Sequence, residues 1–298
     1  MHRLVQLTVR TWLKAHGQLE QWKGLFIENL YSKFPTAEYE NWERYRSLFP
    51  HMKVAVSQRP ESPVSVQQWA TLLYRGAWYA QESGYITESM EMAYRSRKYR
   101  LKVFGAENEE ALESTAMLAG AYQLVGRWEE AEQLFVQVME TRKSKLGADH
   151  PDTLTSMANL ASTFWYQGRW EEAEQLFMQV METRKAKLGA DHPSTLTSMG
   201  NLASTLWNQG RWEEAEQLEV QVMETRKAKL GADHPDTLTS MANLAFTLES
   251  TGRRSEAIDL LRICVAKQQR ILGPAHPDTV SNSDTLLAWE TGDVAIKA

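Results

Sequence analysis

The chain contains 298 residues, of which 43% are hydrophobic, and its net charge is −5. This composition supplies enough apolar surface for a folded chain, and no run of about 18 apolar residues predicts a membrane-spanning helix. The single cysteine, Cys264, excludes an intramolecular disulfide and is expected in a buried position, which fits the reducing cytoplasm. We therefore expect a cytoplasmic protein with no membrane partner.

The charge is unevenly distributed along the chain. Residues 1–104 carry 15 Lys or Arg and 9 Asp or Glu, a balance of +6, whereas the remainder carries 18 and 29, a balance of −11. An acidic main segment argues against nucleic acid as a partner. The two parts are expected to contact different partners, or each other.

The first part of the chain predicts short helices separated by helix breakers. Apolar residues recur at helical spacing, and Pro35, Pro50 and the loop at 59–63 interrupt them. The predicted helices cover residues 2–13 with an end near Gly17, then 19–34, then 37–48 before Pro50, and a shorter helix to about residue 57.

A repeat of 42 residues organises the chain after Pro63. The same step separates the histidines His150, His192, His234 and His276, and also the glycines Gly84, Gly126, Gly168, Gly210 and Gly252. A fixed period of this length predicts stacked units that each contact only their neighbours. The predicted two-helix units are 66–104, 108–146, 150–188, 192–230 and 234–272, followed by a more polar closing helix at 276–290.

Each unit predicts a helix A and a helix B. In the unit with helix A at 151–167, Pro151 suits the first helical turn and Gly168 suits a left-handed end. Helix B, at 169–188, carries an apolar stripe that includes Trp170 and Phe177 at helical spacing. The matching Trp128, Trp170 and Trp212 are interpreted as core residues, and the glutamates and basic residues at the two ends of helix B are interpreted as complementing the helix dipole.

These residues resemble a known repeat family. Small residues alternate with large ones as in the tetratricopeptide repeat, lengthened here to 42 residues, at Leu160, Ala161, Phe164, Gly168, Trp170, Ala173 and Phe177. The Leu-Gly-Ala-Asp-His-Pro between units and the Ala-Asn-Leu-Ala of helix A are similar to the kinesin-light-chain type. The resemblance implies an all-α, right-handed superhelical solenoid of five helix pairs and a capping helix over 64–298, after a helical segment at 1–63.

The beginning of the chain resembles a different family. Met1-His2-Arg3-Leu4-Val5-Gln6, followed by Trp12-Leu13, is similar to the end of the winged-helix region in the NB-ARC or NACHT ATPases of fungal NLR-like STAND proteins. That resemblance implies that the chain is the C-terminal piece of a longer protein, with the upstream nucleotide-binding domain as a further partner. Arg3 stands where Asp often follows the histidine in that family, and no phosphate-binding loop is present. We expect the chain itself to bind no nucleotide and no other cofactor.

No constellation of residues predicts catalysis or a metal site. Repeats are displaced by roughly 10 Å, so the four recurring histidines cannot share a metal whose ligands lie about 2 Å away; they are interpreted as loop residues before helix A. The repeated glutamate pairs fit dipole complementation better than acid–base chemistry. Cys264 has no evident His or Asn partner for a nucleophile. We therefore predict a protein that is not an enzyme.

Differences between the copies predict a peptide-binding groove. Most substitutions lie on helix A, and several of them fall at positions that line the concave face of tetratricopeptide folds. An asparagine is fixed at one such position, and its amide can both donate and accept hydrogen bonds. The alternative explanation for these differences is random sequence drift at exposed positions. The predicted groove residues are Asn159, Asn201, Asn243, Ser162, Ser204, Phe246, Tyr166, Asn208, Ser250, Trp165, Trp207 and Glu249. Glu219 stands at the position that Phe135 and Phe177 occupy in the two preceding copies. Because those residues are expected in the core, we expect local loosening or an exposed edge at Glu219.

The predicted function is recognition of a protein or peptide, as the sensor and autoregulatory repeat domain of an NLR-like protein of innate immunity or non-self recognition. The alternative is a cargo adaptor of the kinesin-light-chain kind or a general scaffold protein. Such an adaptor needs a heptad coiled coil upstream, and the chain contains none.

Overall fold

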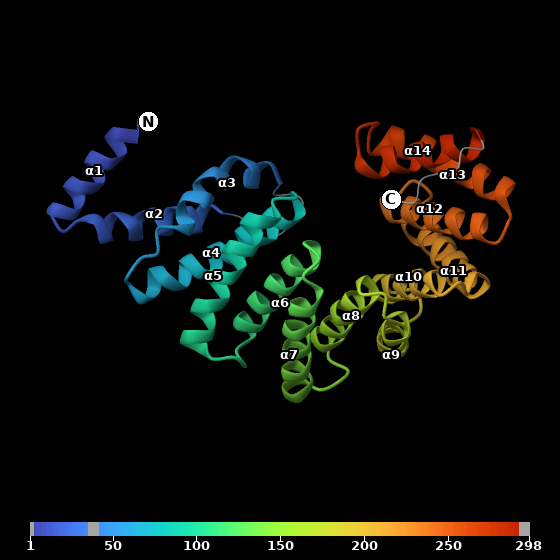
Figure 1. Ribbon diagram of the computed structural model, residues 1–298, viewed down its shortest axis with the longest axis horizontal. Coiled ribbons are helices and arrows are strands. Elements are labelled where there is room, and N and C mark those ends of the chain that lie inside the picture. The colour runs from blue at the N-terminus through green and yellow to red at the C-terminus, as the bar shows by residue number, and fades with distance from the viewer. Residues whose placement is uncertain (1–2, 35–41, 292–298) are drawn as a thin grey trace. The chain divides into compact units, whose positions relative to one another are not determined.

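The structure is a computed structural model that describes residues 3–34 and 42–291, and within these ranges the chain forms fourteen α-helices and no strand (Figure 1). The predicted all-α class is therefore confirmed. No helix among these residues is long and apolar enough to cross a membrane. The resemblance at Met1-His2, and the predicted start of the third helix at 37–41, lie outside the described residues.

The chain divides into two compact units, Met1–Thr163 and Phe164–Ala298, with the boundary inside α8. Unit 1 contains α1 (Arg3–Ala15), α2 (Leu19–Lys33), α3 (Trp42–Val56), α4 (Pro63–Glu82), α5 (Ile86–Phe104), α6 (Glu109–Leu124), α7 (Trp128–Leu146) and most of α8 (Pro151–Tyr166). Unit 2 contains the end of α8, then α9 (Trp170–Leu188), α10 (Pro193–Asn208), α11 (Trp212–Leu230), α12 (Pro235–Ser250), α13 (Arg254–Ile271) and α14 (Pro277–Thr291).

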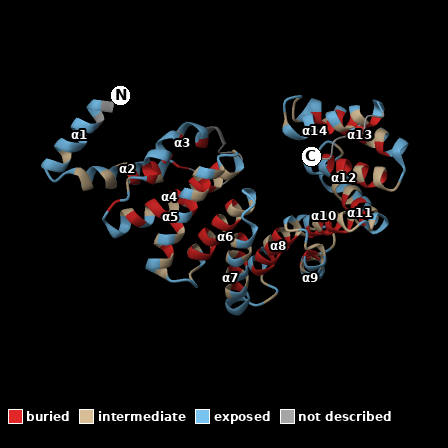
Figure 2. Ribbon diagram, in the orientation of Figure 1, coloured by how far each residue is buried: buried red, intermediate tan, exposed pale blue. Residues whose placement is uncertain are grey.

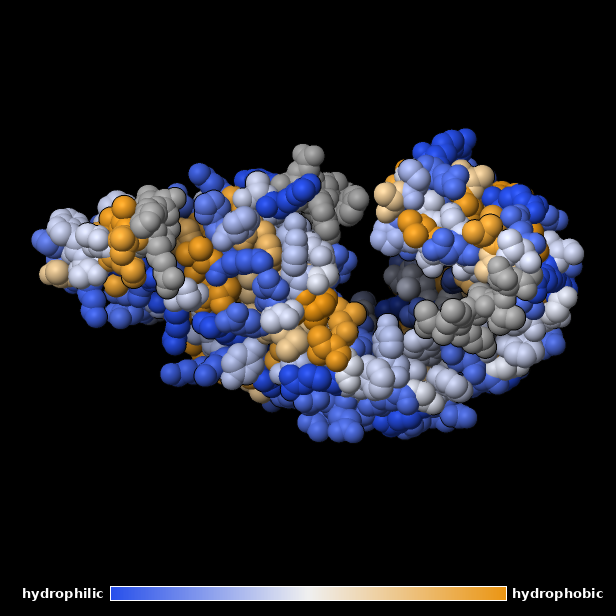
Figure 3. All heavy atoms as spheres, turned by 45° about the horizontal axis from the view of Figure 1, so that its top comes forward, coloured by the Kyte–Doolittle hydropathy of each residue, from blue (hydrophilic) through white to orange (hydrophobic). Residues whose placement is uncertain are grey.

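The N-terminal helices α2 and α3 share a core with the first helix pair. Buried side chains of α2, α3, α4 and α5 form one cluster, in which Tyr45 stacks on Tyr79 with ring centroids 5.0 Å apart. By contrast, α1 is exposed along nearly its whole length (Figure 2). Its apolar residues face solvent, and hydrophobic atoms gather at that end of unit 1 (Figure 3). The amphipathic helix predicted at 2–13 therefore forms without a core contact for its apolar side.

One predicted break is absent from α3. The sequence predicted that a helix stops before Pro50, yet α3 continues through Pro50 to Val56. Proline costs about 3 kcal/mol inside a helix because it has no N–H to donate. Tyr45, Phe49, Met52 and Ala55 lie on the buried side of α3, so tertiary packing offsets this cost.

The helix pairs begin and end within a few residues of the predicted boundaries. Gly168 has φ of 75° and Gly189 has φ of 94°, so both occupy the left-handed region in which a side chain would be strained. Helix A therefore ends one or two residues before the first glycine, and helix B ends directly before the second. Trp128 and Trp212, predicted as core residues, are each 38% exposed because they are the first residues of their helices.

The recurring histidines cap helix A. His192 Nδ1 accepts a hydrogen bond from Ser194 N at 3.1 Å, and His150, His234 and His276 accept in the same way from the backbone two residues later. Their predicted position before helix A is confirmed. Accepting through Nδ1 satisfies one of the free N–H groups at the start of a helix, and Asn108 does the same for α6.

An arginine joins each of the B helices α5, α7, α9 and α11 to the next helix A. Arg142 Nη1 donates to Ser156 Oγ at 3.0 Å and to the carbonyl of Asp152 at 3.3 Å. The same pair recurs as Arg100–Ser114, Arg184–Ser198 and Arg226–Ser240, with 2.9, 3.0 and 2.8 Å between the atoms. Arg184 therefore has a role beyond complementing the helix dipole, because its partly buried side chain also forms a joint between repeats.

The last joint uses neutral side chains. Gln268 and Asn282 stand 42 residues after Arg226 and Ser240, and Asn282 Nδ2 donates to Gln268 Oε1 at 3.1 Å. Both residues are buried between α13 and α14. Cys264 lies in the same core, fully buried, and its thiol donates to the carbonyl of Leu238 at 3.2 Å. The predicted burial of Cys264 is confirmed.

Candidate functional site

The predicted groove residues all lie on helices of the A type, namely α8, α10 and α12. None of the twelve is fully buried; Tyr166 is 47% exposed, and the other eleven are partly exposed. Side chains at these positions therefore reach solvent, as a ligand-binding surface requires. Asn159 and Ser162 belong to unit 1, and the other ten belong to unit 2.

Six of the predicted residues line one pocket in unit 2. This pocket, which we call the Trp207 pocket, has a volume of about 310 Å³ and is lined by Trp165, Ser204, Trp207, Asn208, Glu219, Asn243, Phe246 and Thr247. The end of α8 and helices α10 and α12 supply seven of these residues, and α11 supplies Glu219. Asn201, Tyr166, Glu249 and Ser250 belong to the same unit but do not line the pocket.

Hydrogen bonds fix the walls of the Trp207 pocket. Trp207 Nε1 donates to Ser250 Oγ at 3.0 Å, and Ser250 Oγ donates to the carbonyl of Phe246 at 3.0 Å. Asn208 Nδ2 donates to the carbonyl of Ser204 at 2.8 Å. Phe246 also packs edge-on against Trp289 of α14, with ring centroids 5.4 Å apart. These contacts order the aromatic side chains before any ligand arrives, which lowers the entropic cost of binding.

The sequence did not predict Glu219 and Thr247 as pocket residues. Glu219 is 6% exposed, so the expectation of an exposed edge at this position is wrong. Its carboxylate takes the place that a phenylalanine ring has in the preceding repeat, and it is buried within α11. Burial raises the pKa of Glu219 to about 7, a rise that the Thr247 hydroxyl opposes and the Glu216 carboxylate enhances. The signal in the sequence was the change from Phe to Glu at a core position.

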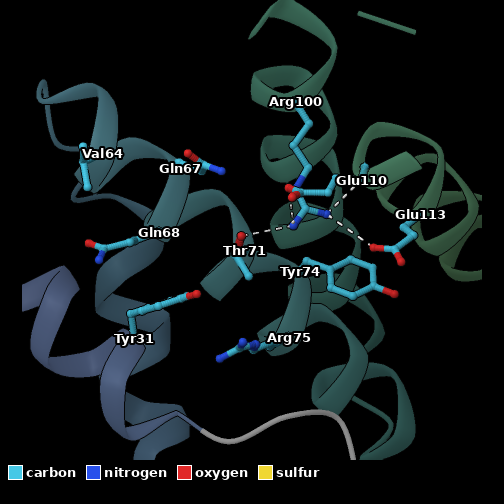
Figure 4. A pocket seen from close by; sticks show the side chains of 10 residues that line it. All are labelled: Tyr31, Val64, Gln67, Gln68, Thr71, Tyr74, Arg75, Arg100, Glu110 and Glu113. Carbon is cyan, nitrogen blue, oxygen red and sulfur yellow. Dashed lines mark hydrogen bonds and ion pairs between the residues drawn. The ribbon is translucent and has the colours of Figure 1, made fainter. Parts of the chain in front are cut away.

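A second pocket lies in unit 1, between α2, α4, α5 and α6 (Figure 4). This Arg100 pocket has a volume of about 480 Å³ and is lined by Tyr31, Val64, Gln67, Gln68, Thr71, Tyr74, Arg75, Arg100, Glu110 and Glu113. Arg100 is 2% exposed and reaches Thr71, Glu110 and Glu113, as the dashed lines in Figure 4 show. Tyr31 extends from α2 toward α4, where the guanidinium of Arg75 lies 5.0 Å from its ring centre.

The charges of the Arg100 pocket largely compensate one another. Arg100 Nη2 lies 3.3 Å from Glu110 Oε2, and Arg100 Nη1 lies 3.9 Å from Glu113 Oε2. Burial lowers the pKa of Arg100 and raises the pKa values of Tyr74 and Glu113. Arg100 also forms the first Arg–Ser joint, with Ser114. Its position is therefore explained by repeat stacking, and the sequence could not predict the pocket because α2 closes it from outside the repeat.

No group of three or more His, Cys, Asp or Glu side chains that could hold a metal ion is found over residues 3–34 and 42–291. The Trp207 pocket offers aromatic faces, one buried carboxyl group and amide and hydroxyl groups. Such a lining suits binding of a side chain that is apolar over most of its length and carries one polar end.

Comparison with known proteins identifies the repeat. Models of the tetratricopeptide repeat match residues 110–186, 195–236 and 237–278. A crystal structure of putative kinesin light chain nearly identical TPR-like repeats from Podosopora anserina is 31% identical, with a TM-score of 0.57, over 67% of this chain and 96% of that chain. The crystal structure of NprR in complex with its cognate peptide NprX has a TM-score of 0.62 over 98% of this chain and 81% of that chain, and at 14% identity it shows the fold alone.

A nucleotide-binding leucine-rich repeat (NLR)-like protein of Hyaloscypha variabilis is 36% identical over 114 residues, which is 38% of this chain. The match spans only 12% of that protein's length. The tetratricopeptide matches, the stacked helix pairs and the Podosopora repeats agree with the predicted solenoid, which is confirmed as the fold. The chain therefore belongs to the tetratricopeptide-repeat family, whose fold is a scaffold for binding proteins or peptides.

Proposed function

We propose that the chain is the sensor and autoregulatory repeat domain of an NLR-like signalling protein, and that it binds a protein or peptide ligand through the predicted groove residues. The observation that carries the first part is the similarity to the NLR-like protein of Hyaloscypha variabilis. The resemblance of residues 1–13 to the end of an NB-ARC or NACHT region supports the same proposal. In this proposal 1–63 is the linker to a nucleotide-binding domain, 64–298 is the repeat array, and the protein acts in the cytoplasm.

The Trp207 pocket supports the second part of the proposal. Its Trp207 ring is held by a hydrogen bond to Ser250, and the pocket gathers residues from three successive A helices. Binding sites for single anchor side chains are apolar, concave and largely preformed, and anchors of this kind dominate the energetics of protein interfaces. Asn243, which lines the pocket and is partly exposed, adds an amide that can donate to and accept from a peptide backbone.

A second candidate function is that of a cargo adaptor or general scaffold of the kinesin-light-chain kind. The observation that favours it is the 31% identity to the Podosopora anserina repeats, which are described as those of a putative kinesin light chain. Both candidates require a protein ligand, and they differ in the domain that accompanies the repeats.

The sequence of the complete transcript distinguishes the two candidates. A phosphate-binding loop followed by an NB-ARC or NACHT region upstream of residue 1 supports the sensor, whereas a heptad coiled coil there supports the adaptor. An upstream region with neither feature contradicts both.

Selection of a displayed library of random dodecapeptides on the chain tests ligand binding directly. We expect enriched peptides whose affinity falls about tenfold or more in the Trp207→Ala variant, because the variant removes the largest wall of the pocket. Peptides that bind wild type and variant equally, or a library that yields no enriched sequence, would contradict a ligand site at the predicted groove.

A further inference from the structure

The Trp207 pocket contains a buried acid without a counter-charge. Glu219 Oε2 is buried without a hydrogen-bond partner in the described part of the chain, and the hydroxyl of Thr247 is the one neighbour that favours the ionised form of Glu219. The equivalent positions of the two preceding repeats hold Phe135 and Phe177, which are 2% and 3% exposed. Burying an unpaired acid where a ring would pack costs free energy unless a ligand compensates it.

None of the eight residues that line this pocket is basic. The arginines of the adjoining turns are already paired with carboxylates: Arg211 with Glu174 and Glu214, and Arg253 with Glu216 and Glu256. Glu216, on the same helix as Glu219, adds negative charge to its surroundings. The lining residues contributed by α8, α10 and α12 carry no titratable side chain. The positive charge that would satisfy Glu219 must therefore come from outside these residues.

The remaining walls suit a cation as well as an apolar group. Trp165, Trp207 and Phe246 line the same pocket as the Glu219 carboxyl group, and the faces of such rings attract guanidinium and ammonium groups. The Trp207 ring is held in place by its hydrogen bond to Ser250. Beyond the pocket, residues 105–298 carry 18 Lys or Arg against 29 Asp or Glu, and this excess of negative charge attracts basic partners.

We propose that the Trp207 pocket holds a positively charged side chain, arginine or lysine, of the protein or peptide ligand, with its charged end against Glu219 and its methylene stem between the aromatic rings. This inference rests on the proposed ligand-binding function and specifies the residue that the ligand must contribute. An acidic side chain would meet the Glu219 carboxylate, and a purely apolar one would leave that carboxylate unpaired.

Because the pKa of Glu219 is raised to about 7, binding of a cation in this pocket should depend on pH. A cation favours the ionised carboxylate, so binding lowers the pKa of Glu219 and releases a proton when the pH is below 7. Affinity for a basic peptide should therefore rise as the pH increases from about 6 to about 8.

The test uses peptides enriched from the random dodecapeptide library on the wild-type chain. We expect a basic residue at one fixed position, and replacement of that residue by citrulline or norleucine should weaken binding at least about tenfold. Glu219→Gln should cause a similar loss, and Glu219→Phe should abolish the preference for a basic residue by filling the pocket. Glu213→Gln, an exposed change on the same helix, serves as the matched control and should leave affinity unchanged.

Failure of this inference differs from failure of the proposed function. Peptides that lose affinity in Trp207→Ala but lack a basic residue, or that bind Glu219→Phe as tightly as wild type, would overturn the assignment of the cation while leaving the groove intact. Peptides that bind Trp207→Ala, Glu219→Phe and the wild-type chain with equal affinity would overturn both the assignment of the cation and the proposed ligand site. Because Phe restores the residue of the two preceding repeats, Glu219→Phe is expected to fold and keeps the test decisive.

Discussion

Arg226 and Ser240 lie fourteen residues apart in the sequence, and their side chains meet at 2.8 Å between helix B of one repeat and helix A of the next. The Ser240 hydroxyl donates a hydrogen bond to the carbonyl of Asp236 at 2.9 Å, so it is both an acceptor and a donor. The joint is therefore a small, fully used polar network at a helix–helix contact, and its members depend on one another.

Replacing Arg226 by Ala should lower the free energy of unfolding by about 1–3 kcal/mol, because the hydroxyl of Ser240 and the carbonyl of Asp236 lose their charged donor. The double variant Arg226→Gln, Ser240→Asn reproduces the Gln268–Asn282 pair and should recover part of that loss. Urea unfolding followed by circular dichroism measures both. A double variant that is no more stable than Arg226→Ala would show that the joint contributes through packing alone.

The histidine caps predict a second, smaller effect. His192→Ala should cost about 0.5–2 kcal/mol, because Ser194 N loses its acceptor at the start of α10. His192→Asn should restore the stability, as Asn108 accepts from Glu110 N and Ala111 N at the equivalent place in α6. The thermal unfolding midpoints of wild type, His192→Ala and His192→Asn, measured in one buffer, test this prediction. Equal midpoints for wild type and His192→Ala would mean that the histidine does not act as a cap.

Glu219 makes stability depend on pH with a defined sign. Its pKa in the folded chain, about 7, exceeds the ordinary value of 4.5, so the folded state holds a proton that the unfolded state releases between these values. Stability therefore falls as the pH rises from about 4.5 to about 7, by on the order of 3 kcal/mol, and the loss levels off above that range.

Glu219→Phe lacks this group, so its stability advantage over wild type should widen across the same pH window. It should also exceed wild type at pH 8, where a buried charge is replaced by a buried ring. The reverse change in the preceding repeat, Phe177→Glu, should destabilise the chain and introduce a similar pH dependence. A stability difference between wild type and Glu219→Phe that is constant from pH 5 to pH 8 would contradict the burial of the Glu219 carboxyl group.

The fixed asparagines predict a loss of binding without a loss of stability. Asn201 and Asn243, both in unit 2, are partly exposed, so replacing both by Ala removes little packing. We expect the thermal midpoint to remain nearly unchanged, while affinity for a library-selected peptide falls because the amides no longer meet the peptide backbone. Isothermal titration and differential scanning calorimetry separate the two quantities. A large drop in the midpoint would assign the asparagines to the scaffold.

Cys264 should be inert in the folded chain. Burial raises the pKa of its thiol to about 11, and the side chain is inaccessible between α12 and α13. Iodoacetamide reacts with the thiolate, so alkylation at pH 8 should be at least about a hundredfold slower than in urea. Mass spectrometry of the intact chain follows the reaction. Rapid labelling without denaturant would mean that the C-terminal repeat opens frequently.

Much of the fold could be predicted because the repeat supplies the same signals several times. Pro151 and Gly168 mark the ends of helix A through backbone restrictions that depend little on tertiary context. Pro50 carries the same kind of signal, but there the buried side of α3 outweighs it. The local sequence cannot reveal whether the helix-breaking effect of a proline or the packing of the helix will prevail, since the packing partner lies on a different helix.

The candidate site was predicted less completely for the same reason. Variation between the copies led to Trp207 and Phe246. A surface-exposed carboxylate and a buried one look alike in a sequence, and at Glu219 the sequence predicted local loosening or an exposed edge. The arginine joints left a clear signal, since Arg142, Arg184 and Arg226 keep the 42-residue step. Their position in the last turns of helix B also fitted a surface role, and only the structure separates the two explanations.

The arginine joints also bear on how this array can change its length. Since each joint between α5 and α12 uses the same two side chains at the same sequence spacing, a whole copy of 42 residues can be gained or lost without leaving an unmatched interface. At the neutral Gln268–Asn282 pair, a new copy would leave the side chains of the joint mismatched. Duplication by unequal crossing-over is thus structurally tolerated inside the array.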